Sequence, residues 1–214
     1  MAKLKSSLRN MFLSLFSICL VAGMILAMVN EYTKGPIETS KKLQLENAIR
    51  EVTPEFDNSP AEEAYWAKIN ETDSLKVYPV KKDGKNVGAA IESNSMRGFS
   101  GEIRIIVGLD EKCRLLNYVV LQHAETPGLG DKMKFWFKED KNNRNIIGKE
   151  LKKGDLKVSK DGGSVDAITA ATISSRAFLE AINRAYTAYS GGVSDAGSGA
   201  TAPNDGTTEA TQKK

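Results

Sequence analysis

The longest apolar run of the chain lies near its N-terminus. Residues 11–29 include no charged side chain and are rich in Leu, Ile, Val, Met and Phe. As an α-helix rising about 1.5 Å per residue, this run spans close to the ~30 Å hydrocarbon core of a bilayer. A cleaved signal peptide usually has a shorter apolar region, and residues 26–30 offer no small-x-small cleavage site. The pattern therefore predicts a single transmembrane helix that is retained.

The charges on either side of this run predict its orientation. Lys3, Lys5 and Arg9 precede it, whereas Glu31 follows it almost at once. Because positively charged flanks stay on the cytoplasmic side, residues 1–10 are expected in the cytoplasm. The rest of the chain is then expected on the outer, periplasmic or otherwise extracytoplasmic, side of the cell inner membrane.

Helical spacing continues after the predicted span, within residues 30–70. Pro36 is compatible with a helix start, and apolar residues recur at roughly helical intervals between Ile37 and Val52 through a charged stretch. Pro54 then interrupts the pattern. We expect an amphipathic connector helix followed by a linker.

Short apolar runs with strand character occupy the middle of the chain. The runs 75–80 and 87–91 are joined through Lys82-Asp-Gly-Lys85, which is typical of a tight hairpin turn. The runs 102–107 and 115–121 are rich in β-branched and aromatic residues and are separated by a loop that contains glycine. These two pairs predict an antiparallel sheet.

Two helices are expected after the sheet. A short one covers residues 131–138, where its aromatic side chains reach the core or cover a pocket. The most regular helix begins near Thr172, with Ser174 and Ser175 available as caps. Its apolar stripe consists of Ile173, Ala177, Phe178, Ala181, Ile182, Ala185, Tyr186 and Tyr189.

The end of the chain changes composition. Gly191-Gly192 is expected to stop the long helix, and residues 193–214 are rich in Gly, Ser, Thr and Ala, which predicts a disordered tail. Strands and helices thus fall in separate blocks, with the strands first. This order favours an α+β domain over residues 71–192.

The loop after the last expected strand concentrates residues suited to ligand contact. His123-Ala-Glu-Thr-Pro-Gly-Leu-Gly130 holds one proline and two glycines, so it is stiff yet lets backbone N–H groups approach a ligand. An ordinary strand-to-helix turn with a solvated Glu125 is the alternative. His123 is a candidate neighbour of the ligand, although a lone histidine at a strand end is more often structural. Gly98-Phe-Ser-Gly101 is a second point where backbone could approach closely.

A second cluster precedes the long helix. Residues 164–175 gather five hydroxyl side chains and one carboxylate around small alanines. The first N–H groups of the helix lack intrahelical partners, and together with the helix dipole they suit a phosphate. A helix start with redundant caps is the alternative.

Both clusters resemble known motifs. Asp166-Ala-Ile-Thr-Ala-Ala-Thr172 is similar to the flavinylation motif of the FMN-binding domain family, which reads Asp, two variable residues, Ser or Thr, usually Gly, Ala, and the acceptor Thr. Glu125-Thr-Pro-Gly-Leu-Gly130 matches the second hallmark of that family, and the resemblance covers roughly residues 75–189. Ala170 departs from the motif, since Gly is usual there.

The anchor, the connector and the length of the chain most resemble the G-subunit family of the Rnf ion-translocating oxidoreductase complex. That family is related to the C-subunit family of the sodium-pumping NADH:quinone reductase, whose members are typically longer.

The resemblance implies FMN joined to Thr172 by a phosphoester bond between the threonine hydroxyl and the flavin phosphate. It also implies a separate flavin transferase, because a threonine hydroxyl is a poor nucleophile without a base. Asp166 would help that enzyme recognise the segment, hold a metal ion during transfer, or simply cap its own turn. The residues expected around the cofactor are Glu125, Thr126, Pro127, Gly128, Leu129, Gly130, Asp166, Thr169, Ala171, Ser174 and Ser175.

The implied role is that of an electron relay between membrane-embedded redox proteins, one of them also flavinylated. By resemblance, the complex couples electron flow between ferredoxin and NAD to the movement of Na⁺ or H⁺. The chain has no Gly-x-Gly-x-x-Gly fingerprint for a nicotinamide cofactor and only two cysteines, Cys19 and Cys113, too few for an iron–sulfur cluster. A relay is therefore favoured over a protein that oxidises the substrate itself.

Charge and composition exclude one further class, and two alternatives stay open. The net charge of +3 comes from basic residues scattered among nearly as many acids, which argues against nucleic-acid binding. The alternatives are a membrane-tethered scaffold without a cofactor of its own and a stand-alone extracytoplasmic flavin carrier. A purified protein without colour would favour the scaffold.

Overall fold

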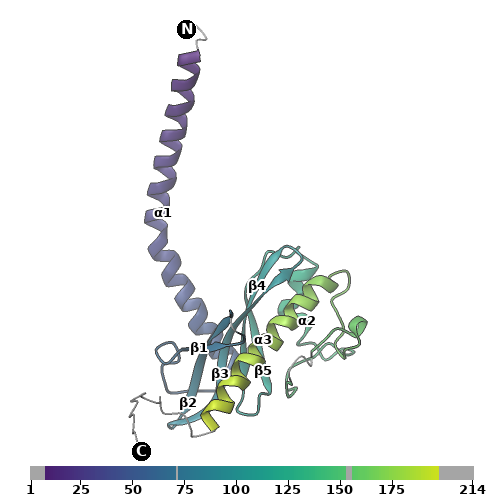
Figure 1. Cartoon of the computed structure of the whole chain (residues 1–214). Coiled ribbons are helices and arrows are strands. Elements are labelled where there is room, and N and C mark those ends of the chain that lie inside the picture. Colours follow the sequence, from purple (N-terminus) through teal and green to yellow (C-terminus); the bar gives the residue numbers. More distant parts are fainter. Residues whose placement is uncertain (1–7, 71, 153–155, 198–214) are drawn as a thin grey trace, which may run out of the picture. The chain divides into compact units, whose positions relative to one another are not determined.

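The computed structural model describes residues 8–70, 72–152 and 156–197. The chain divides into two compact units, Met1–Glu46 and Asn47–Lys214. An apolar N-terminal helix is followed by a five-stranded antiparallel sheet with flanking helices (Figure 1). This architecture confirms the predicted α+β class.

Helix α1, Leu8–Val52, is longer than the sequence predicted. Among the described residues it is the one helix that is long and apolar enough, by length and composition, to cross a membrane. The expectation that a separate helix begins at Pro36 is wrong, because Pro36 lies inside α1. Proline already has a helical φ, so it fits inside a helix at the cost of one backbone hydrogen bond and a steric contact with the carbonyl four residues earlier.

The sheet is a meander in which each strand pairs with the next along the chain, in the order β1-β2-β3-β4-β5. Asp83 and Gly84 form the tight turn between β2 and β3 with φ of 52° and 72°, as expected for a two-residue hairpin. Both predicted hairpins are therefore confirmed. The strands are β1 Tyr65–Lys68, β2 Ser74–Lys82, β3 Lys85–Gly98, β4 Gly101–Leu109 and β5 Leu115–Gln122.

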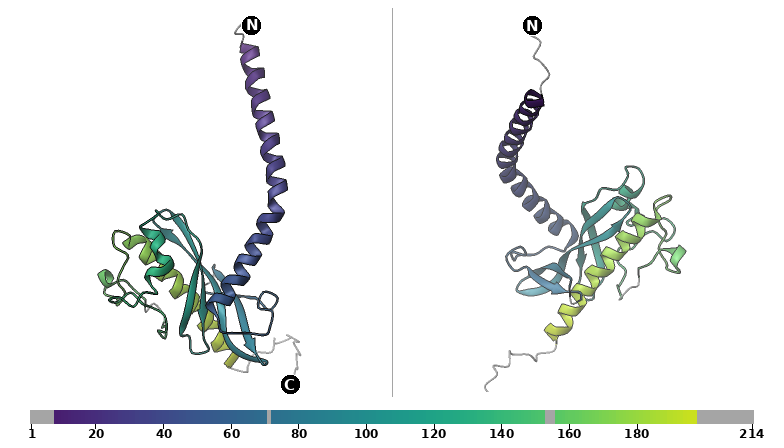
Figure 2. Two further views of the ribbon diagram at one scale, coloured as in Figure 1. Left: turned by 180° about the vertical axis from the view of Figure 1, so that it is seen from behind. Right: turned by 45° about the horizontal axis from the view of Figure 1, so that its top comes forward.

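Helix α3, Thr172–Gly197, crosses one face of the sheet (Figure 2). Its start at Thr172 is as predicted, and its apolar stripe is buried except for Ile173, which is 48% exposed, and the half-buried Tyr186. The expected stop at Gly191-Gly192 is wrong, since the helix continues to Gly197. Glycine lowers helix stability by about 1 kcal/mol relative to alanine but does not by itself end a helix. Of the predicted tail, 193–197 is helical and 198–214 lies outside the described residues.

The last turn of α1 packs on the other face of the sheet. Ala48, Ile49 and Val52 are buried, and a Cβ at Gly108 of β4 would overlap the Val52 carbonyl oxygen. Only glycine allows this approach, because any side chain would separate helix and strand.

Short helical turns connect β5 to α3. The predicted short helix after β5 is present as the 3₁₀ turn η1, Gly130–Lys132, followed by α2, Met133–Trp136. Met133, Trp136 and Phe137 are buried, whereas Phe135 is 51% exposed, so most but not all of its aromatics enter the core. A further 3₁₀ turn, η2, covers Ser159–Asp161.

Candidate functional site

Thr172 is the first residue of α3 and follows a tight turn. The N–H of Ala171 donates to the Ile168 carbonyl across 3.0 Å, which closes the turn just before the helix. Thr172 is half-buried, and among the described residues its hydroxyl has no hydrogen-bond partner. The hydroxyl is therefore available at a helix end where N–H groups and the dipole favour an anion.

Ala170 holds the turn in an unusual conformation. Its φ is +62°, in the left-handed region that alanine rarely adopts. Glycine reaches this region without a Cβ clash. The positive φ explains why the flavinylation motif usually has Gly at this position. The main effect of Ala170 is therefore backbone strain and not the volume of its methyl group.

Ser174 and Ser175 do not act as the helix caps that the sequence predicted. Both lie inside the first turn of α3 and are buried. The Ser175 hydroxyl accepts from the N–H of Ile168 and donates to the Ala171 carbonyl, each across 2.9 Å. It therefore fixes the turn that presents Thr172, while the Ser174 hydroxyl points elsewhere, to Glu125.

Glu125 forms a polar cluster with Ser100 and Ser174, which we call the Glu125 junction. It is only 4% exposed, so the interpretation of a solvated side chain is wrong. Its Oε2 accepts from the Ser174 hydroxyl, and its Oε1 accepts from the N–H of Ser100 across 3.1 Å. A buried carboxylate needs such partners because desolvation is costly. Glu125 thereby joins the β3–β4 turn to the start of α3.

Two glycines make room for this carboxylate. A Cβ on Gly98 would lie 2.7 Å from Oε1 of Glu125, and a Cβ on Gly130 would lie 2.7 Å from Oε2 and 2.6 Å from the Ser174 hydroxyl. The predicted approach point at Gly98-Phe-Ser-Gly101 is thus a close contact with the Glu125 loop.

The rest of that loop projects outward. Pro127 and Gly128 form the centre of a β-turn closed by the Leu129 N–H and the Thr126 carbonyl, 3.1 Å apart. Gly128 has a φ of +78°, as the third position of a type II turn requires. Thr126, Pro127, Gly128 and Leu129 are all exposed, so their backbone and side chains can contact a ligand.

His123 serves the same loop. Its Nδ1 accepts a hydrogen bond from the N–H of Glu125 across 3.2 Å. Partial burial, assisted by the nearby Lys134 ammonium, lowers the pKa of His123. The neutral ring that this bond requires is therefore favoured, and His123 stabilises the start of the loop at Glu125.

Asp166 anchors the segment before Thr172. Its Oδ1 accepts from the Ser159 hydroxyl across 2.9 Å and its Oδ2 from the N–H of Asn143 across 3.2 Å, while its carbonyl accepts from the Trp136 indole N–H across 2.9 Å. Asp166 thus ties the motif to α2, to η2 and to the loop that contains Asn143. Thr169, between Asp166 and the helix, is exposed, and Ala171 is buried.

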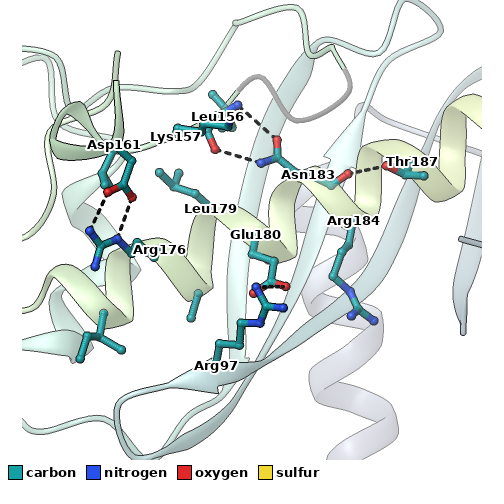
Figure 3. A pocket seen from close by; sticks show the side chains of 13 residues that line it. Arg97, Leu156, Lys157, Asp161, Arg176, Leu179, Glu180, Asn183, Arg184 and Thr187 are labelled. Atoms are coloured by element: carbon teal, nitrogen blue, oxygen red, sulfur yellow. Dashed lines mark hydrogen bonds and ion pairs between the residues drawn. The ribbon is translucent and has the colours of Figure 1, made fainter. Parts of the chain in front are cut away.

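A groove of about 730 Å³ runs along α3 from Ile173 to Thr187 (Figure 3). Its charged lining is largely self-paired: Arg176 binds Asp161 across 2.6 Å, and Arg97 lies 3.6 Å from Glu180. Within the described residues, no group of three or more His, Cys, Asp or Glu side chains could hold a metal ion.

Comparison with known proteins bears directly on this site. Residues 98–187 match the FMN-binding domain family, a range that runs from Gly98 through the whole Glu125 junction to α3. The chain is 34% identical over 192 residues to the G subunit of the ion-translocating oxidoreductase complex of Shewanella piezotolerans, covering 85% of this chain and 88% of that protein. The chain belongs to the G-subunit family of ion-translocating oxidoreductase complexes.

Other members give the same result. The G subunit of Aliivibrio fischeri is 34% identical over 193 residues, with 84% of this chain and 88% of that protein covered. The G subunit of Escherichia coli strain K12 is 34% identical over 170 residues, covering 74% of this chain and 80% of that protein. The resemblance seen in the two motifs is thereby confirmed over most of the length of a G-subunit protein.

Sequence reasoning missed most of the contacts that hold the site together. Ser100, which binds Glu125 from 25 residues away, was not predicted as a partner, and neither were Trp136, Asn143 and Ser159, which bind Asp166. Ser174 was predicted near the cofactor, but not as the partner of Glu125, 49 residues away. No local pattern marks such contacts, because each depends on how the sheet and α3 come together. The only sequence signal for the contact of Ser100 was the nearby pair Gly98 and Gly101, which predicted a close backbone approach.

Proposed function

We propose that FMN is attached to Thr172 of this G-subunit protein through a phosphoester bond to the threonine hydroxyl. The observation that carries the proposal is the half-buried hydroxyl, without a partner among the described residues, at the first residue of a 26-residue helix. The N–H groups and dipole at that helix end favour the negative charge of the phosphate. The turn fixed by Ser175 and Ala170 places Thr172 at this helix end.

The bond requires a separate flavin transferase. The acids of the two motifs are engaged, since Glu125 accepts from Ser174 and Ser100 and both carboxylate oxygens of Asp166 accept hydrogen bonds. Activation of a hydroxyl requires a free general base or a metal. Asp166 keeps the acceptor segment in place for the transferase, whether or not the transferase also binds it.

The Glu125–Gly130 loop is proposed to line the cofactor. Its turn from Thr126 to Leu129 is exposed beside the junction that holds the start of α3. The Thr126 side chain and the backbone at Gly128 can therefore contact the ribityl chain or the ring, with Thr169 and Ala171 on the side of the phosphate.

The physiological role that we infer is electron relay in an ion-translocating oxidoreductase complex. FMN accepts and donates one or two electrons, and the protein holds it in place and prevents its loss through the covalent bond. Residues 11–29 anchor the chain, and the basic residues before them favour an extracytoplasmic domain. Its partners are the other proteins of the complex, which couples ferredoxin and NAD chemistry to Na⁺ or H⁺ movement.

The test is production of the full chain with its flavin transferase in three variants. Thr172→Ala is expected to lose the fluorescent band after denaturing electrophoresis, whereas Thr172→Ser should keep it because the hydroxyl remains. Ser164→Ala, an exposed hydroxyl outside the motif, is the matched control and should label fully. Mass analysis of the peptide that contains Thr172 measures the added FMN.

A fluorescent band that survives in Thr172→Ala would overturn the attachment site. A wild-type protein that stays colourless when the transferase is present would favour the scaffold alternative over a flavoprotein.

A further inference from the structure

Three exposed apolar side chains lie around the start of α3. Phe99 is 67% exposed, Ile173 48% and Leu129 39%. They come from the β3–β4 turn, the first turn of α3 and the loop after β5, which meet at one end of the domain (Figures 1 and 2). We call these three residues the apolar collar.

The Glu125 junction brings the collar together. Each collar residue is the immediate chain neighbour of a residue in that junction: Ser100 and Ser174, which donate to the carboxylate, and Gly130, where a Cβ would lie 2.7 Å from it. Consecutive Cα atoms are about 3.8 Å apart. Each collar residue is therefore bonded to a residue that lies against the Glu125 carboxylate, although Phe99 and Ile173 are 74 residues apart in the chain.

We propose that the apolar collar binds the isoalloxazine ring, with Phe99 and Ile173 as contact residues in addition to the loop. The inference rests on the proposed attachment of FMN to Thr172. Ile173 directly follows that residue, so a ring tethered there lies within reach of the collar. Flat aromatic rings gain from burial against apolar and aromatic side chains, and aromatic pairs stack in an offset or edge-to-face arrangement.

The groove along α3 is less suited to the ring. The groove along α3 also begins at Ile173, but its walls carry the Arg176–Asp161 and Arg97–Glu180 ion pairs. A ring placed between these pairs would desolvate charged groups without adding partners for them. The collar offers apolar surface and leaves those pairs in water.

The test uses the flavinylated full chain in detergent and measures quenching of flavin fluorescence by iodide. Phe99→Ala and Ile173→Ala should each raise the quenching constant by about twofold, because one of the two ring faces loses its cover. Phe99→Leu keeps an apolar side chain and should stay near wild type. Trp66→Ala is the matched control: Trp66 is also 67% exposed but lies on β1, at the opposite edge of the sheet from β5.

Three outcomes separate the alternatives. Equal quenching in all variants with full flavin content would overturn the collar while leaving the attachment at Thr172 intact. If Phe99→Ala leaves quenching unchanged but releases the other proteins of the complex during purification, the collar contacts a partner protein and the proposal is wrong. Absence of flavin from the wild type, by contrast, would refute the attachment itself.

Discussion

The left-handed backbone at Ala170 leads to a prediction of stability that runs against the usual effect of glycine. A left-handed alanine costs roughly 1–2 kcal/mol in steric energy. Replacement by glycine removes that cost but adds roughly 0.5–1 kcal/mol of chain entropy to the unfolded state. Ala170→Gly should therefore stabilise the domain by ~0.5–1 kcal/mol. The side chain is exposed, so no packing is lost.

Urea unfolding of the full chain in detergent measures this difference. Trp136 is a suitable reporter, since it is 8% exposed and its indole N–H donates to the Asp166 carbonyl in the same motif. Ala171→Gly is the control: Ala171 has no positive φ, so glycine should lower the free energy of unfolding there by roughly 0.5–1 kcal/mol. If both variants lose stability alike, the left-handed conformation at Ala170 is refuted.

Two further changes probe the junction beneath the site. Glu125→Gln should lower the free energy of unfolding by ~1–3 kcal/mol, because a neutral amide loses the charge-assisted hydrogen bonds that the carboxylate accepts from Ser174 and Ser100. The exposed Glu111→Gln should change nothing, and equal stability of both variants would contradict the buried role of Glu125. The lowered pKa of His123 means that the unfolded chain binds its proton more readily, so stability should be complete above about pH 6.5 and fall as the pH drops toward the folded pKa. Unfolding at several pH values should show a smaller acid loss in His123→Gln, and an unchanged profile would refute this assignment.

The sequence predicted correctly those elements whose geometry depends on a few neighbouring residues. Asp83-Gly84 can adopt the positive φ of a tight hairpin, and the alternation on either side sets the register. The start of α3 at Thr172 was predictable from the return of helical spacing. The sequence misled where one residue type has two uses: Pro36 can start a helix or sit inside one, and Gly191 can end a helix or continue it.

Contacts between distant segments were out of reach of such reasoning. The burial of Glu125 depends on Ser174, 49 residues later, and on the absence of a side chain at Gly98 and Gly130. A glutamate beside Pro and Gly in a loop has the composition of a solvated turn. Only the assembled fold shows that the carboxylate faces inward.

The Glu125 junction also joins two motifs that are remote in the chain. Glu125 opens the Pro-Gly loop, and its carboxylate accepts from Ser174, two residues beyond the proposed attachment residue Thr172. A shift of the loop would break that bond and leave a buried charge short of a donor, which is costly. The position of the loop and the position of the helix start are therefore coupled through one side chain. A cofactor held at Thr172 would therefore meet the loop at a defined place, which suits the proposed electron relay because electron transfer depends on distance.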